Sequence, residues 1–301
     1  MQSLLRLARP AAAAVVLASA LTGCLKSDQT ITVYPDSSGK IQMKTTLLGM
    51  MAQMAKMGGP GGQMGGPGGA PAEKPDPFEI LKKDVGGKVY WANLKAEDGT
   101  DGSYTLSGTG YFESVNDIQR DQGKMTFTKD AATGGYLLEM KPEIPNEITG
   151  EKKEGAPELT PEQEQMQKQM LEMMKGMMAG FDMKVTIVMP GNVTKAEGMK
   201  ATEGTRNATF ALGEKELLAI MEKKEKPPKE MKVTSGPADD KALEGELATF
   251  KKELADAKAN AAKEAEEKAA KKKADAEKGG ATPPPSGDGE KKPEGKKPTD
   301  F

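Results

Sequence analysis

The sequence lacks histidine entirely and contains a single cysteine among its 301 residues. A chain with one cysteine cannot form an internal disulfide, and one without histidine lacks the commonest general acid–base catalyst and the usual zinc ligand. A nucleophilic enzyme would then need a serine–lysine pair or paired carboxylates, and the acidic residues lie mostly in Lys/Glu runs typical of solvated surface. We therefore expect a protein that is not an enzyme and that binds no cofactor.

Apolar and aromatic residues are also scarce, at 36% and 4% of the chain, whereas 29% of residues are charged. With 35 glycines and 20 prolines, part of the chain cannot bury enough surface to offset its ordering entropy. The formal net charge is only −2, so no overall field favours nucleic acid, and we expect no nucleic-acid partner. The composition predicts a modest folded core joined to disordered segments.

The N-terminal segment 1–23 has the features of a signal peptide. Arg6 and Arg9 precede an apolar stretch from Pro10 to Leu21 that is too short to span a bilayer. The stretch ends in Leu21-Thr22-Gly23-Cys24, which resembles the bacterial lipobox, where the cysteine is acylated and becomes the first residue of the mature protein. Cys24 is thus the predicted lipidation site, and by the sorting rule of such lipoproteins Leu25 favours the outer membrane over the inner. The alternative is an ordinary signal peptide followed by a buried free thiol.

The region 24–236 is predicted to be a lipid-anchored α+β domain: an antiparallel sheet with a few short helices. Period-two alternation and turn residues indicate a hairpin at its start and a meander of strands further on. A helix at 47–57 precedes the Gly/Pro-rich insertion 58–75, and Asp76-Pro77 is typical of a helix start. The strands are expected at 30–34, 40–45, 88–95, 103–112, 124–129, 135–140, 183–189, 207–212 and 231–235, and further helices at 161–179 and 214–224.

The segment 237–278 is rich in Ala, Lys and Glu and is predicted to form a charged helix, followed by a disordered tail at 279–301. Its apolar residues recur at alternating steps of four and three, which leaves two interpretations open. One is a solvated spacer helix, and the other is a coiled coil that joins copies of the chain. The residues of this seam are Leu243, Leu247, Phe250, Leu254, Ala257 and Ala261.

Two parts of the predicted domain resemble one known family. They are Cys24-Leu25-Lys26 with the strand Ile31-Thr32-Val33 and the turn ending at Gly39, and the later Val185–Gly191 with Val193, Ala196 and Gly198. Together they resemble the LppM-type lipoprotein domain of actinobacteria. This resemblance implies an α/β domain beside a lipid anchor and a role in handling lipids or glycolipids, and it supplies no catalytic residues.

The 20 methionines are the most unusual feature of the composition. Six of them fall on one face of the predicted helix 161–179, and three interpretations remain open. The face is a buried core stripe, or an adaptable groove for apolar ligands such as acyl chains, or a thioether site for Cu(I). The candidate groove residues are Met166, Met170, Met173, Met174 and Met177, with Met178 beside them; Met170, Met173 and Met174, or Met50, Met51 and Met54, would supply the sulfurs of a metal site.

These observations predict a non-enzymatic lipoprotein of the bacterial envelope that is tethered through Cys24. Its domain would bind an apolar, lipid-like ligand or an envelope protein partner. The alternatives are a methionine-rich periplasmic copper-binding protein and a purely structural envelope component.

Overall fold

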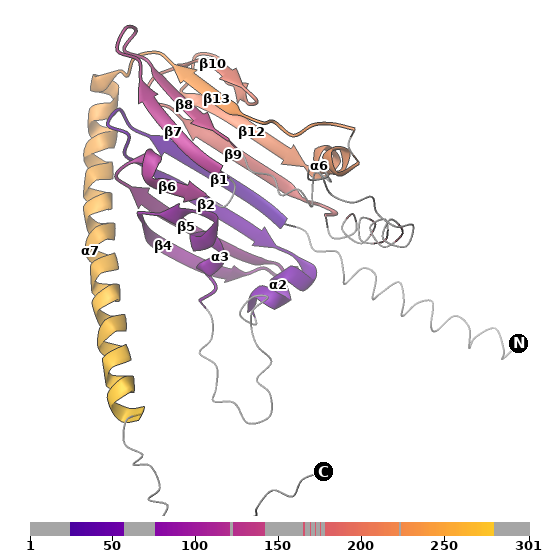
Figure 1. Ribbon diagram of the computed structural model, residues 1–301, viewed down its shortest axis with the longest axis vertical. Coiled ribbons are helices and arrows are strands. Elements are labelled where there is room, and N and C mark those ends of the chain that lie inside the picture. Colours follow the sequence, from indigo (N-terminus) through magenta and orange to yellow (C-terminus); the bar gives the residue numbers. More distant parts are fainter. Residues whose placement is uncertain are drawn as a thin grey trace, which may run out of the picture. The chain divides into compact units, whose positions relative to one another are not determined.

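The computed structural model describes residues 25–56, 76–120, 123–141, 178–222 and 224–279, together with Gln165, Gln169, Glu172 and Lys175, which are helical. The chain divides into two units, Met1–Lys258 and Ala259–Phe301. The first contains two β-sheets and several helices, so the prediction of an α+β fold is confirmed (Figure 1).

The larger sheet has seven strands in the order β11-β12-β9-β1-β2-β5-β4. Neighbouring strands are antiparallel except for β1 and β9, which run parallel. The strands are β1 (Leu25–Val33), β2 (Gly39–Leu47), β4 (Val89–Asp98), β5 (Tyr104–Phe112), β9 (Asp182–Val188), β11 (Lys200–Ala201) and β12 (Asn207–Gly213).

The smaller sheet has six strands in the order β10-β13-β8-β7-β6-β3, and its described pairs are antiparallel. Its presence means that the expected strands divide between two sheets rather than forming one. The strands are β3 (Gly86–Gly87), β6 (Ile118–Arg120), β7 (Gly123–Lys129), β8 (Tyr136–Met140), β10 (Val193–Glu197) and β13 (Met231–Ser235).

The parallel pairing of β1 with β9 places the two family-like segments side by side. Ile31 in β1 is in register with Ile187 in β9, and both side chains are fully buried. β1 is also antiparallel to β2, where Ile31 faces Ile41. The strand that begins directly after Cys24 is therefore an inner strand of the larger sheet, bonded on both sides.

A single apolar core joins residues from both sheets. Along β2 and β8 buried and more exposed residues alternate, as expected for strands with one face on a core. The rings of Phe127 (β7) and Tyr136 (β8) stack with their centroids 5.5 Å apart. The core continues across to Ile41, Leu106 and Ile187 of the larger sheet.

The helices are short except for the last. They are α2 (Gly49–Lys56), α3 (Glu79–Asp84), the 3-10 turn η1 (Val115–Asp117), α6 (Glu214–Met221) and α7 (Asp240–Gly279). The helix start expected at Asp76-Pro77 lies three residues before α3, which begins at Glu79. Asp76 nevertheless accepts a hydrogen bond from the Phe78 amide at 2.9 Å and pairs with Lys82 at 2.7 Å. No described helix has both the length and the apolar character needed to cross a bilayer.

The compact unit extends past the boundary at residue 236 suggested by composition, because the first half of α7 packs on the larger sheet. Phe250 and Ala257 of α7 are buried with Tyr34 and Tyr111 in a second apolar cluster. The seam of the helix is thus covered by the chain's own sheet at these positions. From Ala259 the second unit continues as helix to Gly279.

Candidate functional site

Most of the residues that the sequence singled out for function lie outside the part of the chain that the structure describes; Met51 and Met178 are exceptions. Those outside it are the lipidation residue Cys24 and the groove residues Met166, Met170, Met173, Met174 and Met177, three of which form the alternative metal set. The side chains of Met50 and Met54 are likewise outside the described set. Their immediate neighbours, however, are placed.

The methionine-rich segment is fastened beside α6 by charged groups. Lys175 Nζ lies 2.9 Å from Glu222 Oε1 and 3.1 Å from Glu172 Oε1. The amide of Gly180, which adopts a positive φ of 76°, donates to Glu214 at 2.7 Å. These contacts hold the end of the segment against both ends of α6.

The charged groups that join this segment to α6 shift one another's pKa values. Hydrogen bonds from Lys224 and then Lys175 lower the pKa of Glu222 to about 2. Its hydrogen bond to Glu222, followed by that to Glu172, raises the pKa of Lys175 above its ordinary value. The pairing is therefore present throughout the neutral range.

α2 contributes the one large apolar side chain that is exposed among the described residues. Met51 is 37% exposed, whereas Ala52 and Ala55 of the same helix are buried against the core. The expected helix 47–57 begins two residues later than predicted, at Gly49, whose φ of 56° requires glycine. Met51 thus faces outward while the alanine face of the helix closes the core.

The described residues contain no group of three or more Cys, Asp or Glu side chains arranged to hold a metal ion. This finding does not test the thioether hypothesis, whose ligands would be methionine sulfurs. Only Met51 of the two proposed thioether sets has a described side chain.

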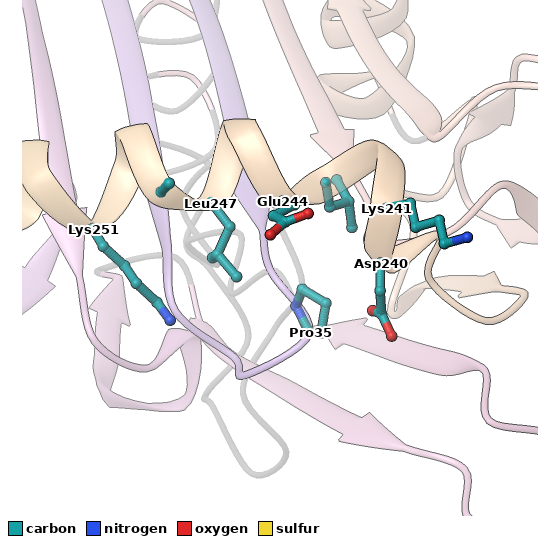
Figure 2. A pocket seen from close by; sticks show the side chains of 8 residues that line it. Pro35, Asp240, Lys241, Glu244, Leu247 and Lys251 are labelled. Carbon is teal, nitrogen blue, oxygen red and sulfur yellow. The ribbon is translucent and has the colours of Figure 1, made fainter.

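A groove of about 510 Å³ follows the first turns of α7, where the helix passes the turn after β1 (Figure 2). Its apolar floor is Pro35, Leu243 and Leu247, and charged side chains, including Glu244 and Lys251, stand along its rim. A smaller hollow of about 270 Å³ lies at the β7–β8 turn beside Asp130 and Tyr136. Neither hollow contains a candidate groove or metal residue, although Leu243 and Leu247 of the first belong to the seam that the sequence offered for a coiled coil.

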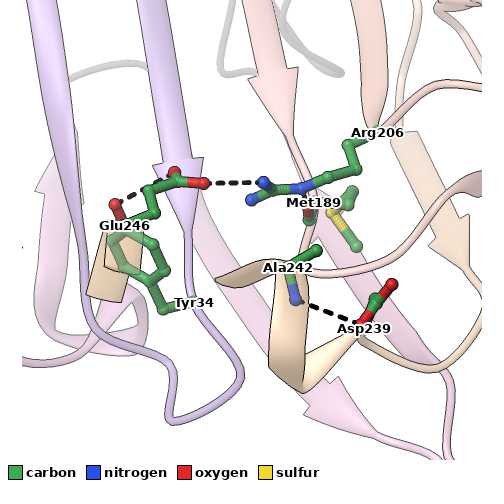
Figure 3. Close-up of polar contacts among 6 residues, drawn as sticks. All are labelled: Tyr34, Met189, Arg206, Asp239, Ala242 and Glu246. Atoms are coloured by element: carbon green, nitrogen blue, oxygen red, sulfur yellow. Dashed lines mark hydrogen bonds and ion pairs between the residues drawn. The ribbon is translucent and has the colours of Figure 1, made fainter. Parts of the chain in front are cut away.

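A polar network fixes α7 next to this groove (Figure 3). The Tyr34 hydroxyl donates to Glu246 Oε1 at 3.1 Å, and Arg206 Nη1 lies 2.9 Å from Glu246 Oε2. Arg206 Nε also donates to the Met189 carbonyl at 2.6 Å. Burial, and then the negative charge of Glu246, raise the pKa of the Tyr34 phenol far above its usual value. One carboxylate therefore ties the helix to two segments of the larger sheet.

Sequence reasoning missed this network, because nothing in the local pattern around Arg206 connects it to residue 246. The available signal was the apolar seam of α7, which predicts some packing partner. The two interpretations of the seam are a solvated spacer helix and a coiled coil between copies of the chain. In the structure, Tyr34 and Tyr111 cover the buried part of the seam.

The folded part is similar to the solved NMR structure of the folded domain of the Mycobacterium tuberculosis LppM protein. The match has a TM-score of 0.32 and 12% sequence identity, and it covers 72% of this chain and 93% of that domain. No protein-family model and no curated protein matches the sequence. The likeness is the same family resemblance that the sequence motifs suggested, a weak similarity to an LppM-like fold.

Proposed function

We propose that the chain is a lipoprotein of the bacterial cell envelope, anchored in a membrane by acyl chains on Cys24. The observation that carries this proposal is the junction between leader and fold: the lipobox-like sequence ends at Cys24, and β1 begins at Leu25. Cleavage before Cys24 would remove the leader and leave the folded domain whole. Several acyl chains, at about 0.8 kcal/mol per buried methylene, make such an anchor effectively permanent.

The domain would then serve as a binding module rather than an enzyme. In support, the methionine-rich segment is fastened next to α6 through Lys175 and Glu222, close to the strand that follows the anchor. Unbranched, polarizable methionine side chains repack readily around varied apolar ligands. We propose that a lipid-like ligand, or an apolar segment of an envelope protein, binds there. Leu25 after the cysteine favours the outer membrane as the site of anchoring.

The anchor is tested by changing Cys24→Ser and following the protein in detergent phase separation. We expect the wild-type protein in the detergent phase and the variant in the aqueous phase. Ser19→Ala is the matched control, because it alters the leader but keeps both arginines and Cys24. A Cys24→Ser protein that still entered the detergent phase would contradict lipid anchoring at this residue.

Ligand binding is tested by native mass spectrometry of the Cys24→Ser protein isolated from an envelope fraction, before and after addition of Cu(I). Bound lipid mass supports the proposed binding module. Retained copper without lipid would favour the metal-binding alternative. A clean mass under both conditions would contradict lipid binding and copper binding, and would leave the structural role and a protein partner as the remaining functions.

A further inference from the structure

The end of the larger sheet nearest the anchor is a single row of residues. Leu25 of β1 is in register with Leu47 of β2, Leu47 with Tyr104 of β5, and Tyr104 with Asp98 of β4. Leu25 is also the residue after Cys24. No residue separates the acylated cysteine from the first paired residue of the sheet.

α2 lies across this row. It begins two residues after Leu47, and at its other end Lys56 Nζ lies 2.5 Å from Asp98 Oδ1 and 5.7 Å from the centre of the Tyr104 ring. Figure 1 shows α2 and α6 at the end of the sheet where β1 begins. The outward side chain Met51 is therefore at the anchored end of the domain.

The distances involved are short. Neighbouring strands are about 4.8 Å apart, so the span from Leu25 to Tyr104 is about 10 Å. Consecutive Cα atoms are about 3.8 Å apart, which places Cys24 at the edge of the same row. The headgroup region adds about 5–7 Å on each side of the hydrocarbon core, and amphipathic helices enter it by about 5–10 Å. An anchor at Cys24 thus brings α2 within reach of the headgroups.

We propose that this end of the domain docks on the bilayer surface, with α2 at the headgroup level and Met51 inserted among the lipids. The proposal rests on the anchoring at Cys24 proposed above. The partner of this surface is the phospholipid leaflet that holds the acyl chains. Because no spacer lies between Cys24 and β1, the domain cannot stand far from that leaflet. The domain would then meet its lipid-like ligands at the surface of the membrane.

The test uses the full-length acylated protein reconstituted into vesicles of phosphatidylethanolamine and phosphatidylglycerol. Met51→Cys is labelled with a nitrobenzoxadiazole dye; the acylated Cys24 has no free thiol, so the dye reports one position. Gln53→Cys, also exposed on α2, is a second probe in case the first variant does not fold. Lys241→Cys is the matched control, since it is exposed in the first turn of α7 beside Pro35, at the far end of β1.

We expect blue-shifted emission and quenching by spin-labelled lipid at position 51, and a water-like spectrum without quenching at position 241. Vesicle-bound protein with a water-like spectrum at both 51 and 53 would overturn the docking while leaving the anchor intact. Protein that fails to float with the vesicles would overturn both. Shielding of position 51 in native envelopes but not in pure lipid would show that a protein covers α2, and would also overturn the proposal.

Discussion

The centre of the Phe250 ring lies 4.5 Å from the centre of the Tyr34 ring, which joins the long helix α7 to the residue that follows β1. Both side chains are fully buried, and the centre of the Tyr111 ring lies 6.3 Å from that of Phe250. Aromatic pairs of this kind add about 0.5–1.5 kcal/mol beyond the area that they bury. Phe250 thus packs α7 against the sheet through these two aromatic contacts.

Phe250→Ala should detach the first half of α7 while the sheets remain folded. Removing a buried phenylalanine costs about 3–5 kcal/mol. Amide hydrogen exchange is the measurement, and we expect faster exchange across residues 240–258 and unchanged exchange in β1 and β2. Lys251→Ala, an exposed neighbour, is the control and should change the stability by less than about 0.5 kcal/mol. Equal protection of α7 in both variants would contradict this role.

Alkaline pH should destabilise the contact between α7 and the sheet. Burial, followed by the charge of Glu253, raises the pKa of Tyr111 to about 12, and burial raises that of Tyr34 further. An unfolded tyrosine titrates near pH 10, so the unfolded chain loses these protons first and stability falls as pH rises above about 10. Denaturant unfolding at pH 8 to 11.5 measures the effect. In the Tyr34→Phe variant the free energy of unfolding should fall less steeply with pH. A fall as steep as that of the wild type would show that Tyr34 does not cause the effect.

Gly245→Ala should stabilise α7, because a methyl group at this position meets no atom within 4 Å and the residue is exposed in the helix interior. Replacing glycine by alanine in a helix gains about 0.5–1 kcal/mol. Thermal unfolding followed by circular dichroism would detect the gain. A lower melting temperature would mean that position 245 packs against something in solution.

Gly110→Ala should lower the stability of the protein, in contrast to Gly245→Ala. The added methyl group would lie 2.6 Å from Val89 Cγ1 and 3.5 Å from the Trp91 ring, so the edge strand β4 must shift. Overpacking of this kind costs about 1–3 kcal/mol. Since Trp91 is the sole tryptophan, its emission reports the shift directly. An unchanged emission spectrum and an unchanged stability would show that β4 accommodates the methyl group without loss of stability.

Acidification should release the methionine-rich segment from α6. The pKa of Glu222 is lowered to about 2 by Lys224 and Lys175, so the carboxylate keeps its charge until well below pH 4.5 and the pairing is lost as pH falls through about 2. NMR titration of the Glu222 carboxyl carbon measures this, and Glu222→Gln should remove the transition. A midpoint near the ordinary glutamate value would show that the contact with Lys175 is not maintained in solution.

The features that sequence patterns predicted are local ones. The alternation through Ile31 and Ile41 is sufficient to indicate a hairpin, and Asp76-Pro77 indicates a helix close to α3, which begins at Glu79. The division into two sheets depends on the parallel pairing of β1 with β9, between residues more than 150 positions apart. No period or turn signal encodes a pairing of that separation.

The geometry of the candidate site likewise depends on contacts between distant residues. The outward position of Met51 was not predicted, because the sequence grouped this residue with Met50 and Met54 as a possible thioether set; in the structure Ala52 and Ala55 form the buried face of the helix. The place of Met51 at the end of the sheet where β1 begins follows from the register of Leu25, Leu47 and Tyr104, which only the fold reveals. The ion pair of Arg206 with Glu246 joins residues 40 positions apart on different elements and had no sequence signal.

The inner position of β1 has a mechanical consequence. A pull on the residue after Cys24 acts on a strand whose hydrogen bonds to β2 and β9 lie on both sides. Tension along β1 must shear two ladders together, whereas an edge strand would peel from one. The first strand is thus better suited to carry load than either edge strand of the same sheet.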